Sequence, residues 1–227
     1  MTSDAPSAHE RILRAALELL DEGGAEAVST RAVTARAQVQ APALYRLFGD
    51  KEGLLDAAVE RVHADWVAAK STRTLPEDPV EAIRVGFDDA VRFGLDHPAA
   101  YRLAQARADP GAAIALGIAM LQEKVATVAR AGRLRETPER ASALLHAVGR
   151  GVTLSLLDTP PEQRDLRVAE VARESVIAAV TTEAPPGDRV TLTSTAVALR
   201  ALLPEAEALL PAERQLMELW LERIANV

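Results

Sequence analysis

Side chains suited to reading and gripping a nucleic acid gather in one short stretch of the sequence. Gln40 and Arg46 carry the donors and acceptors that pair bidentately with adenine and guanine in the major groove. The ionic residues from 29 to 51 give this segment a charge of +3, whereas the whole 227-residue chain carries −7. A small basic region in an acidic protein favours DNA as its partner.

Other kinds of chemistry lack their residues. The chain has no cysteine, which excludes disulfides, thiolate metal sites and cysteine nucleophiles. The four histidines are scattered without zinc-type spacing, so we predict no metal site. Ser155 and Asp158 near His146 suggest a hydrolase, but no nucleophile elbow, phosphate loop or dinucleotide fingerprint accompanies them. We therefore predict neither an enzyme nor a cofactor.

The elements that must position the DNA-reading residues are predicted to be helices. Ser7 and Glu10 form a capping box, and apolar residues then recur at helical period as far as Leu20. Gly23 and Gly24 are expected to end this first helix, because glycine adopts the left-handed C-terminal conformation without steric cost.

Two short helices and a longer one are predicted to follow. Ser29 and Thr30 begin the second helix, Pro42 lies in the first turn of the third, and Asp50 caps the fourth. This order is typical of a helix-turn-helix unit, whose later helix enters the major groove.

The third helix divides into two faces. Leu44, Leu47 and Phe48 are expected to pack inward. The residues expected to face outward are small or polar: Gln40, Ala41, Ala43, Tyr45 and Arg46.

Residues 29–55 closely resemble the TetR family of repressors. The family's spacing of tyrosine, phenylalanine and lysine is present as Tyr45, Phe48 and Lys51. With the first helix included, the resemblance covers residues 7–62. It implies that Ser29, Tyr45 and Lys51 contact phosphate. It also implies that Gln40, Ala43 and Arg46 contact bases or the adjacent backbone. The full predicted DNA-binding set is Ser29, Thr30, Gln40, Ala41, Ala43, Tyr45, Arg46 and Lys51.

Three positions depart from the family pattern. Gln38 replaces the usual turn glycine, Gln40 replaces the usual serine, and Pro42 replaces a frequent glycine. Gln38 must therefore adopt the turn without the freedom of glycine, and Gln40 is a poor cap. These departures keep an alternative open, namely a helical ligand-binding or adaptor protein that no longer binds DNA.

The rest of the chain is also predicted to be helical. Prolines punctuate it, and no convincing strand or repeat occurs, so we predict an all-α fold of about ten helices. The expected domains are a helix-turn-helix DNA-binding domain over 1–51 and a helical regulatory and dimerisation domain over 52–227. A linker is possible near 184–188, and the segment after Gly187 has no assigned role.

A homodimer is expected, because two heads must reach successive major grooves about 34–36 Å apart. Residues 138–157 and 161–182 are the candidate dimer helices, with monomer core as their alternative role. Their apolar residues are Leu144, Leu145, Val148, Val152, Leu156, Leu166, Ala169, Ala172, Val176, Ala179 and Val180.

The resemblance also implies a small-molecule effector that releases the repressor from double-stranded operator DNA. Aromatic residues are scarce in this chain, and their grouping before the dimer helices suggests a mostly apolar pocket. The candidate pocket residues are Trp66, Phe87, Val91, Tyr101, Met120, His146 and Arg150. No segment is expected to span a membrane, and the protein is expected to be cytoplasmic.

Overall fold

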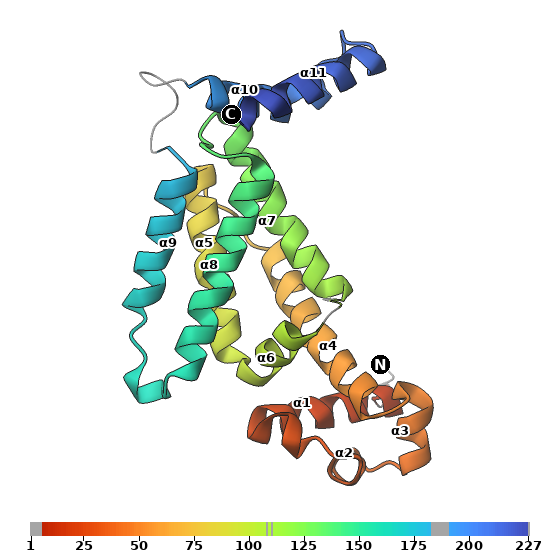
Figure 1. Ribbon diagram of the computed structural model, residues 1–227. Helices are drawn as coiled ribbons and strands as arrows, with labels where there is room; N and C mark the ends of the chain where they lie inside the picture. The colour runs from red at the N-terminus through yellow and green to blue at the C-terminus, as the bar shows by residue number, and fades with distance from the viewer. Residues whose placement is uncertain (1–5, 108, 110, 183–190, 227) are drawn as a thin grey trace. The chain divides into compact units, whose positions relative to one another are not determined.

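The computed structural model describes residues 6–107, 109, 111–182 and 191–226. These residues form eleven α-helices and two short 3₁₀ turns without any strand, which confirms the prediction of an all-α fold (Figure 1). The chain separates into two compact units. The first comprises Met1–Arg73 and Phe93–Leu116, and the second comprises Thr74–Arg92 and Gly117–Val227.

The first unit contains the predicted helix-turn-helix. Its complete helices are α1 (Ala8–Ala27), α2 (Thr30–Ala37), α3 (Ala41–Phe48), α4 (Lys51–Ser71) and α6 (Pro98–Ala106). It also contains the end of α5 (Pro79–Asp96) and the start of α7 (Ala112–Arg130).

Local capping signals set the start and the interruption of α1. The Ser7 hydroxyl accepts a hydrogen bond from the Glu10 amide, and the Glu10 carboxylate accepts one from the Ser7 amide, so the capping box is confirmed. Gly23 and Gly24 leave helical geometry, and Gly24 has a φ of +67°. A short helical segment then continues to Ala27. The first helix therefore ends at these two glycines as predicted, and the label α1 also covers the short helical segment that follows them.

One apolar cluster holds α1 to α4 together with α6. Its largest fully buried side chains are Ile12, Leu20, Val28, Val33, Leu44 and Leu54. Phe48 packs against this cluster and stacks on His9, with 4.8 Å between the ring centres. The predicted inward position of Leu47 is wrong, because 37% of this residue is exposed. Leu47 lies 60° around the helix from Leu44, so it is at the edge of the inward face, where solvent reaches it.

The second unit consists of longer helices and a C-terminal pair. It contains most of α5 and α7. Its elements are α5 (Pro79–Asp96), α7 (Ala112–Arg130), α8 (Pro138–Asp158), η1 (Pro161–Gln163), α9 (Arg167–Val180), α10 (Leu192–Leu202), η2 (Leu203–Glu205) and α11 (Pro211–Ala225).

The α8 and α9 helices pack side by side, as Figure 1 shows. Both lie close to the segments predicted for dimerisation, although α9 begins only after the η1 turn. Six of the residues predicted for the dimer face are buried within the chain itself: Leu145, Val152, Leu156, Ala169, Val176 and Val180. For these six the alternative of monomer core holds.

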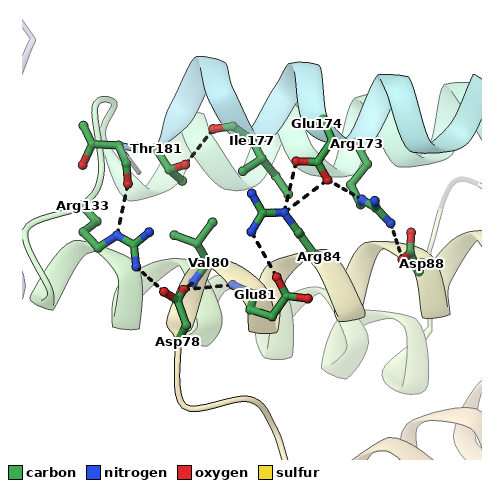
Figure 2. A network of polar contacts seen from close by, with 11 residues as sticks. Asp78, Val80, Glu81, Arg84, Asp88, Arg133, Arg173, Glu174, Ile177 and Thr181 are labelled. Carbon is green, nitrogen blue, oxygen red and sulfur yellow. Dashed lines mark hydrogen bonds and ion pairs between the residues drawn. The ribbon is translucent and has the colours of Figure 1, made fainter. Parts of the chain in front are cut away.

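Ion pairs fasten one side of α9 to α5 (Figure 2). Arg84 of α5 donates to both carboxylate oxygens of Glu174 at 3.1–3.2 Å, and Arg173 pairs with Asp88. Farther along, Arg133 donates to Asp78 at 2.7 Å. This network fixes which side of α9 faces α5 and leaves the opposite side exposed.

The α7 helix is long and apolar enough to cross a membrane by length and composition alone, which the sequence prediction overlooked. The core helix of a soluble protein passes the same test. In the second unit, α7 contributes the fully buried residues Val125, Val128 and Ala129 to the core.

Candidate nucleic-acid interface

The turn between α2 and α3 forms without glycine. Gln38 adopts the left-handed conformation with φ 53° and ψ 51°, alone among the described residues other than glycine. The amides of Gln38 and Val39 both donate to the carbonyl of Thr34. The predicted departure at this position is thus accommodated in the backbone, at a conformational cost that glycine would not incur.

Side-chain capping differs between α2 and α3. The Ser29 hydroxyl accepts from the Ala32 amide at 3.2 Å and so caps α2. Gln40 makes no side-chain cap at the start of α3, as expected, and it is exposed. Its amide group is therefore available for an external partner. Ala41 and Ala43 lie half-buried in the first turn beside it.

Tyr45 projects from the outer side of α3. It is 51% exposed, although large aromatic residues are usually well covered in a folded protein. Its hydroxyl lies 3.5 Å from the hydroxyl of Thr30 at the start of α2. Thr30 therefore positions the phenol, and the two short helices present one shared surface.

The cations of this region divide into two kinds. Arg36 pairs with Glu22 at 2.8 Å and with Glu18 at 3.9 Å, so its charge is neutralised by α1. Arg46 and Lys51 are exposed, and neither forms an ion pair with any residue that the structure describes. These two positive charges are thus available to an anion such as phosphate.

The α3–α4 junction is held rigidly. The Asp50 carboxylate accepts from the Gly53 amide at 2.8 Å and caps α4, as predicted. A Cβ atom on Gly53 would lie only 2.2 Å from the carbonyl oxygen of Phe48. Glycine is therefore required at a position that the sequence reasoning did not single out. The rigid junction fixes Lys51 next to the end of α3.

We call the exposed set formed by Ser29, Gln40, Tyr45, Arg46 and Lys51 the recognition surface. The structure brings these residues together on α2, α3 and the start of α4, over one continuous core. Arg31 was omitted from the predicted set, yet it is also exposed in the first turn of α2. The signal that could have found it is its place two residues after the cap Ser29.

The predicted pocket residues fall into both compact units. Trp66 and Tyr101 belong to the first unit, where Trp66 stacks on Phe93 with 4.7 Å between ring centres. Phe93 also meets the buried His63 edge-on at 4.7 Å. Burial lowers the pKa of His63, which favours its neutral form. These contacts make Trp66 part of an aromatic cluster that includes a buried histidine.

The other predicted pocket residues belong to the second unit. Phe87 and Val91 of α5 are buried, and a Cβ atom on Gly149 of α8 would lie 3.4 Å from the Phe87 ring. Phe87 and α8 are therefore in close contact. The list is completed by the half-buried Met120 of α7 and the exposed His146 and Arg150 of α8.

Sequence reasoning missed a half-buried cation in this unit. Lys124 of α7 lies against Gly86 of α5, and a Cβ atom there would be 3.6 Å from the lysine chain. Desolvation lowers the pKa of Lys124, and the nearby carboxylate of Asp89 partly offsets this effect. The pKa of His146 is also lowered, by partial desolvation and by the cation of Arg150, although the residue as a whole is exposed. Burial, which the sequence does not report, is the missing signal.

Comparisons with known proteins agree with this architecture. Residues 12–58 match the family model described as bacterial regulatory proteins, tetR family. Tetracycline repressor protein class G of Vibrio anguillarum is 31% identical over 163 residues, which are 70% of this chain and 72% of that protein.

In solved structures the likeness extends beyond the helix-turn-helix. SmeT, the repressor of the Stenotrophomonas maltophilia multidrug efflux pump SmeDEF, is 26% identical with a TM-score of 0.58. The match covers 82% of this chain and 98% of SmeT. A TetR variant from Acinetobacter baumannii AYE in complex with minocycline is 25% identical with a TM-score of 0.57, covering 74% of this chain and 93% of that one. The chain belongs to the TetR family, and it is a DNA-binding repressor that responds to small-molecule effectors.

Proposed function

We propose that the recognition surface carries operator binding, with a distinct role for each side chain. Gln40 and Arg46 lie where a helix in the major groove meets base edges, and their amide and guanidinium groups suit adenine and guanine. Ser29, Tyr45 and Lys51 contact phosphates on either side. The observation that carries this proposal is the exposure of Tyr45, Arg46 and Lys51 above a fully packed core.

A homodimer through α8 and α9 completes the proposal. Among its exposed residues, α8 carries a stripe of small or apolar residues at helical spacing: Ala143, Leu144, Ala147, Gly151 and Ser155. The side of α9 turned away from the α5 ion pairs has the same character: Val168, Val171, Ser175, Ala178 and Ala179. We call these two stripes together the α8–α9 face. Small side chains allow helices of two copies to approach closely and form a four-helix arrangement.

The middle of the α8–α9 face is poor in charge: on α8, Arg140 and Asp158 lie at its two ends and Arg150 lies at its edge. Solvated helix faces usually carry charged residues, whereas ionic residues are depleted at the centre of interfaces between subunits. A Cβ atom on Gly151 would meet nothing within 4 Å in the single chain, so the space above this glycine is open to a second copy.

The effector is proposed to be small and mostly apolar, and to bind in the helical regulatory domain of a cytoplasmic protein. The apolar residues Phe87 and Val91 support this character, and His146 or Arg150 supplies a polar contact. Minocycline in the related Acinetobacter structure makes tetracyclines the first probes to test.

The operator test starts from genomic DNA. The full-length chain is used to select fragments by repeated binding and recovery, and the enriched fragments are sequenced. We expect a palindromic site near the protein's own gene, bound with strong salt dependence. Binding that is indifferent to sequence would contradict the proposal. Minocycline is then titrated into the complex of the protein with its operator. If minocycline releases the wild type but not Phe87→Leu from the operator, and both proteins bind the operator with equal affinity, the result supports the pocket.

A further inference from the structure

The C-terminal hairpin, which we define as residues 192–226 with α10 and α11, carries an exposed apolar surface. Its two helices pack on each other and bury Ala196, Val197, Leu203, Leu221 and Ala225 (Figure 1). Its outer side exposes large apolar residues by 40–75%: Leu192, Leu199, Leu202, Leu210, Leu216, Leu219 and Trp220. These are seven of the fifteen large apolar or aromatic residues that are exposed among the described residues.

Four more of those fifteen lie on or beside the α8–α9 face: Leu144, Leu166, Val168 and Val171. Monomeric proteins rarely expose apolar surface in such a concentration, and contiguous patches of this kind mark interaction sites. Two neighbouring parts of the second unit thus hold most of the uncovered apolar side chains. This distribution marks both parts as candidate interaction sites.

We propose that a second copy of this chain covers the C-terminal hairpin, which acts as a dimerisation arm beside the α8–α9 face. This inference rests on the dimer proposed above. The hairpin adjoins α8 at its first turn, where Arg200 pairs with Glu139 at 3.2 Å and Arg140 donates to Asn226 at 3.1 Å. A second copy that binds to α8 and α9 can therefore contact the hairpin in the same complex.

The α8 part of the α8–α9 face has few large side chains. Alanine, glycine and serine dominate its α8 stripe, and such residues bury little surface. A stable complex buries about 800 Å² on each partner. Tryptophan and leucine supply the most apolar area per residue, and Trp220, Leu216 and Leu219 lie within one turn of α11. The arm adds large apolar side chains to the few that the face itself exposes, which are Leu144, Val168 and Val171.

Charge disfavours other occupants. The hairpin carries three arginines and five glutamates, so its net charge is −2. Phosphate-rich surfaces, whether DNA or anionic lipid, attract basic segments and repel acidic ones. A second copy of an apolar protein surface suits this composition, because it needs no cations.

The first test measures dimer affinity by sedimentation equilibrium of the full-length chain. We expect the double variant Leu216→Glu with Trp220→Glu to weaken the dimer at least ten-fold and to retain wild-type helicity by circular dichroism. The control Gln215→Glu adds a charge at an exposed polar position of the same helix and leaves the dimer unchanged. A double variant that dimerises like the wild type would overturn the arm.

The second test leaves the arm intact. In the Trp66→Phe background, Trp220 is the sole tryptophan, because the chain has only two. Its emission should shift to shorter wavelength as rising protein concentration drives dimer formation. Emission that stays solvent-like in a demonstrated dimer would refute the arm while the dimer stands. A wild-type chain that is monomeric throughout would instead refute the dimer itself. A shift caused by phosphatidylcholine–phosphatidylglycerol vesicles at monomeric concentrations would assign the arm to lipid.

Discussion

The recognition surface and the α8–α9 face are both exposed in the single chain, but their side chains differ in kind. The first presents a phenol, a carboxamide and two unpaired cations from short helices. The second presents alanine, glycine, valine, serine and one leucine from two longer helices. Phosphates and base edges need donors and charge, whereas a second copy of an apolar face needs close contact, and the proposal of two different partners rests on this difference.

The two surfaces also differ in what supports them. The recognition surface depends on local features, such as the Asp50 cap and the turn at Gln38. The α8–α9 face depends on distant contacts, because Arg84 and Glu174, ninety residues apart, set the orientation of α9. Substitutions on the recognition surface should therefore weaken operator binding without affecting the dimer, whereas substitutions on the α8–α9 face should affect both.

The largest effect is expected from Gly151→Glu. The single chain has room for the new side chain, and glutamate favours a helix more than glycine does. In the dimer, an unpaired charge at the centre of the α8–α9 face costs about 3–5 kcal/mol, which is more than a hundred-fold in affinity. Sedimentation equilibrium should show a stable monomer, and operator binding should fall with it. The control is Gln122→Glu on the exposed side of α7. A dimeric Gly151→Glu protein would place the interface elsewhere.

The next effect concerns the recognition surface alone. Arg46→Ala should lower operator affinity roughly ten- to a hundred-fold and relax the preference at one base pair. Lys51→Ala should weaken binding to all sequences alike and reduce the salt slope by about one. Fluorescence anisotropy at several salt concentrations measures both. Arg36→Ala serves as the control, because its charge is already paired with Glu22. Equal losses in all three variants would contradict the division of roles.

A smaller effect is expected at the turn. Gln38→Gly removes the strain of a left-handed glutamine, and after the entropy cost of glycine it should stabilise the chain by up to about 1 kcal/mol. Urea denaturation followed by circular dichroism measures the change. Gln122→Gly in the middle of α7 is the matched control and should destabilise the protein. A destabilised Gln38→Gly protein would show that the turn conformation is wrong.

The smallest effect is a pH dependence from His63. Burial lowers its pKa in the folded chain below the unfolded value of 6.5, so the unfolded state binds a proton first. The contribution of neutral His63 to the free energy of unfolding is therefore fully present above pH 6.5. It is lost as the pH falls from 6.5 through the folded pKa. His63→Leu should lose less stability than the wild type between pH 7.5 and 5.5. Parallel curves for the two proteins would contradict the burial of a neutral histidine.

The helix-turn-helix was predicted from the sequence far better than the α8–α9 face. Caps such as Ser7 and Asp50 act within three residues, so their pattern is visible in the chain itself. The pairing of Arg36 with Glu22 joins residues fourteen positions apart, and no local pattern reveals it. Helical period likewise shows that Leu145 and Val152 share a face but not which surface covers that face. In the structure, other residues of the same chain cover both side chains.

Footprinting of the selected operator tests the central claim most directly. The account predicts two protected segments one helical turn apart on the same side of the duplex, bound by two copies of the chain. It also predicts that Gly151→Glu loses both segments together at protein concentrations where the wild type protects both. A single protected segment from one wild-type chain, or full protection by a monomeric Gly151→Glu protein at the same concentration, would contradict it.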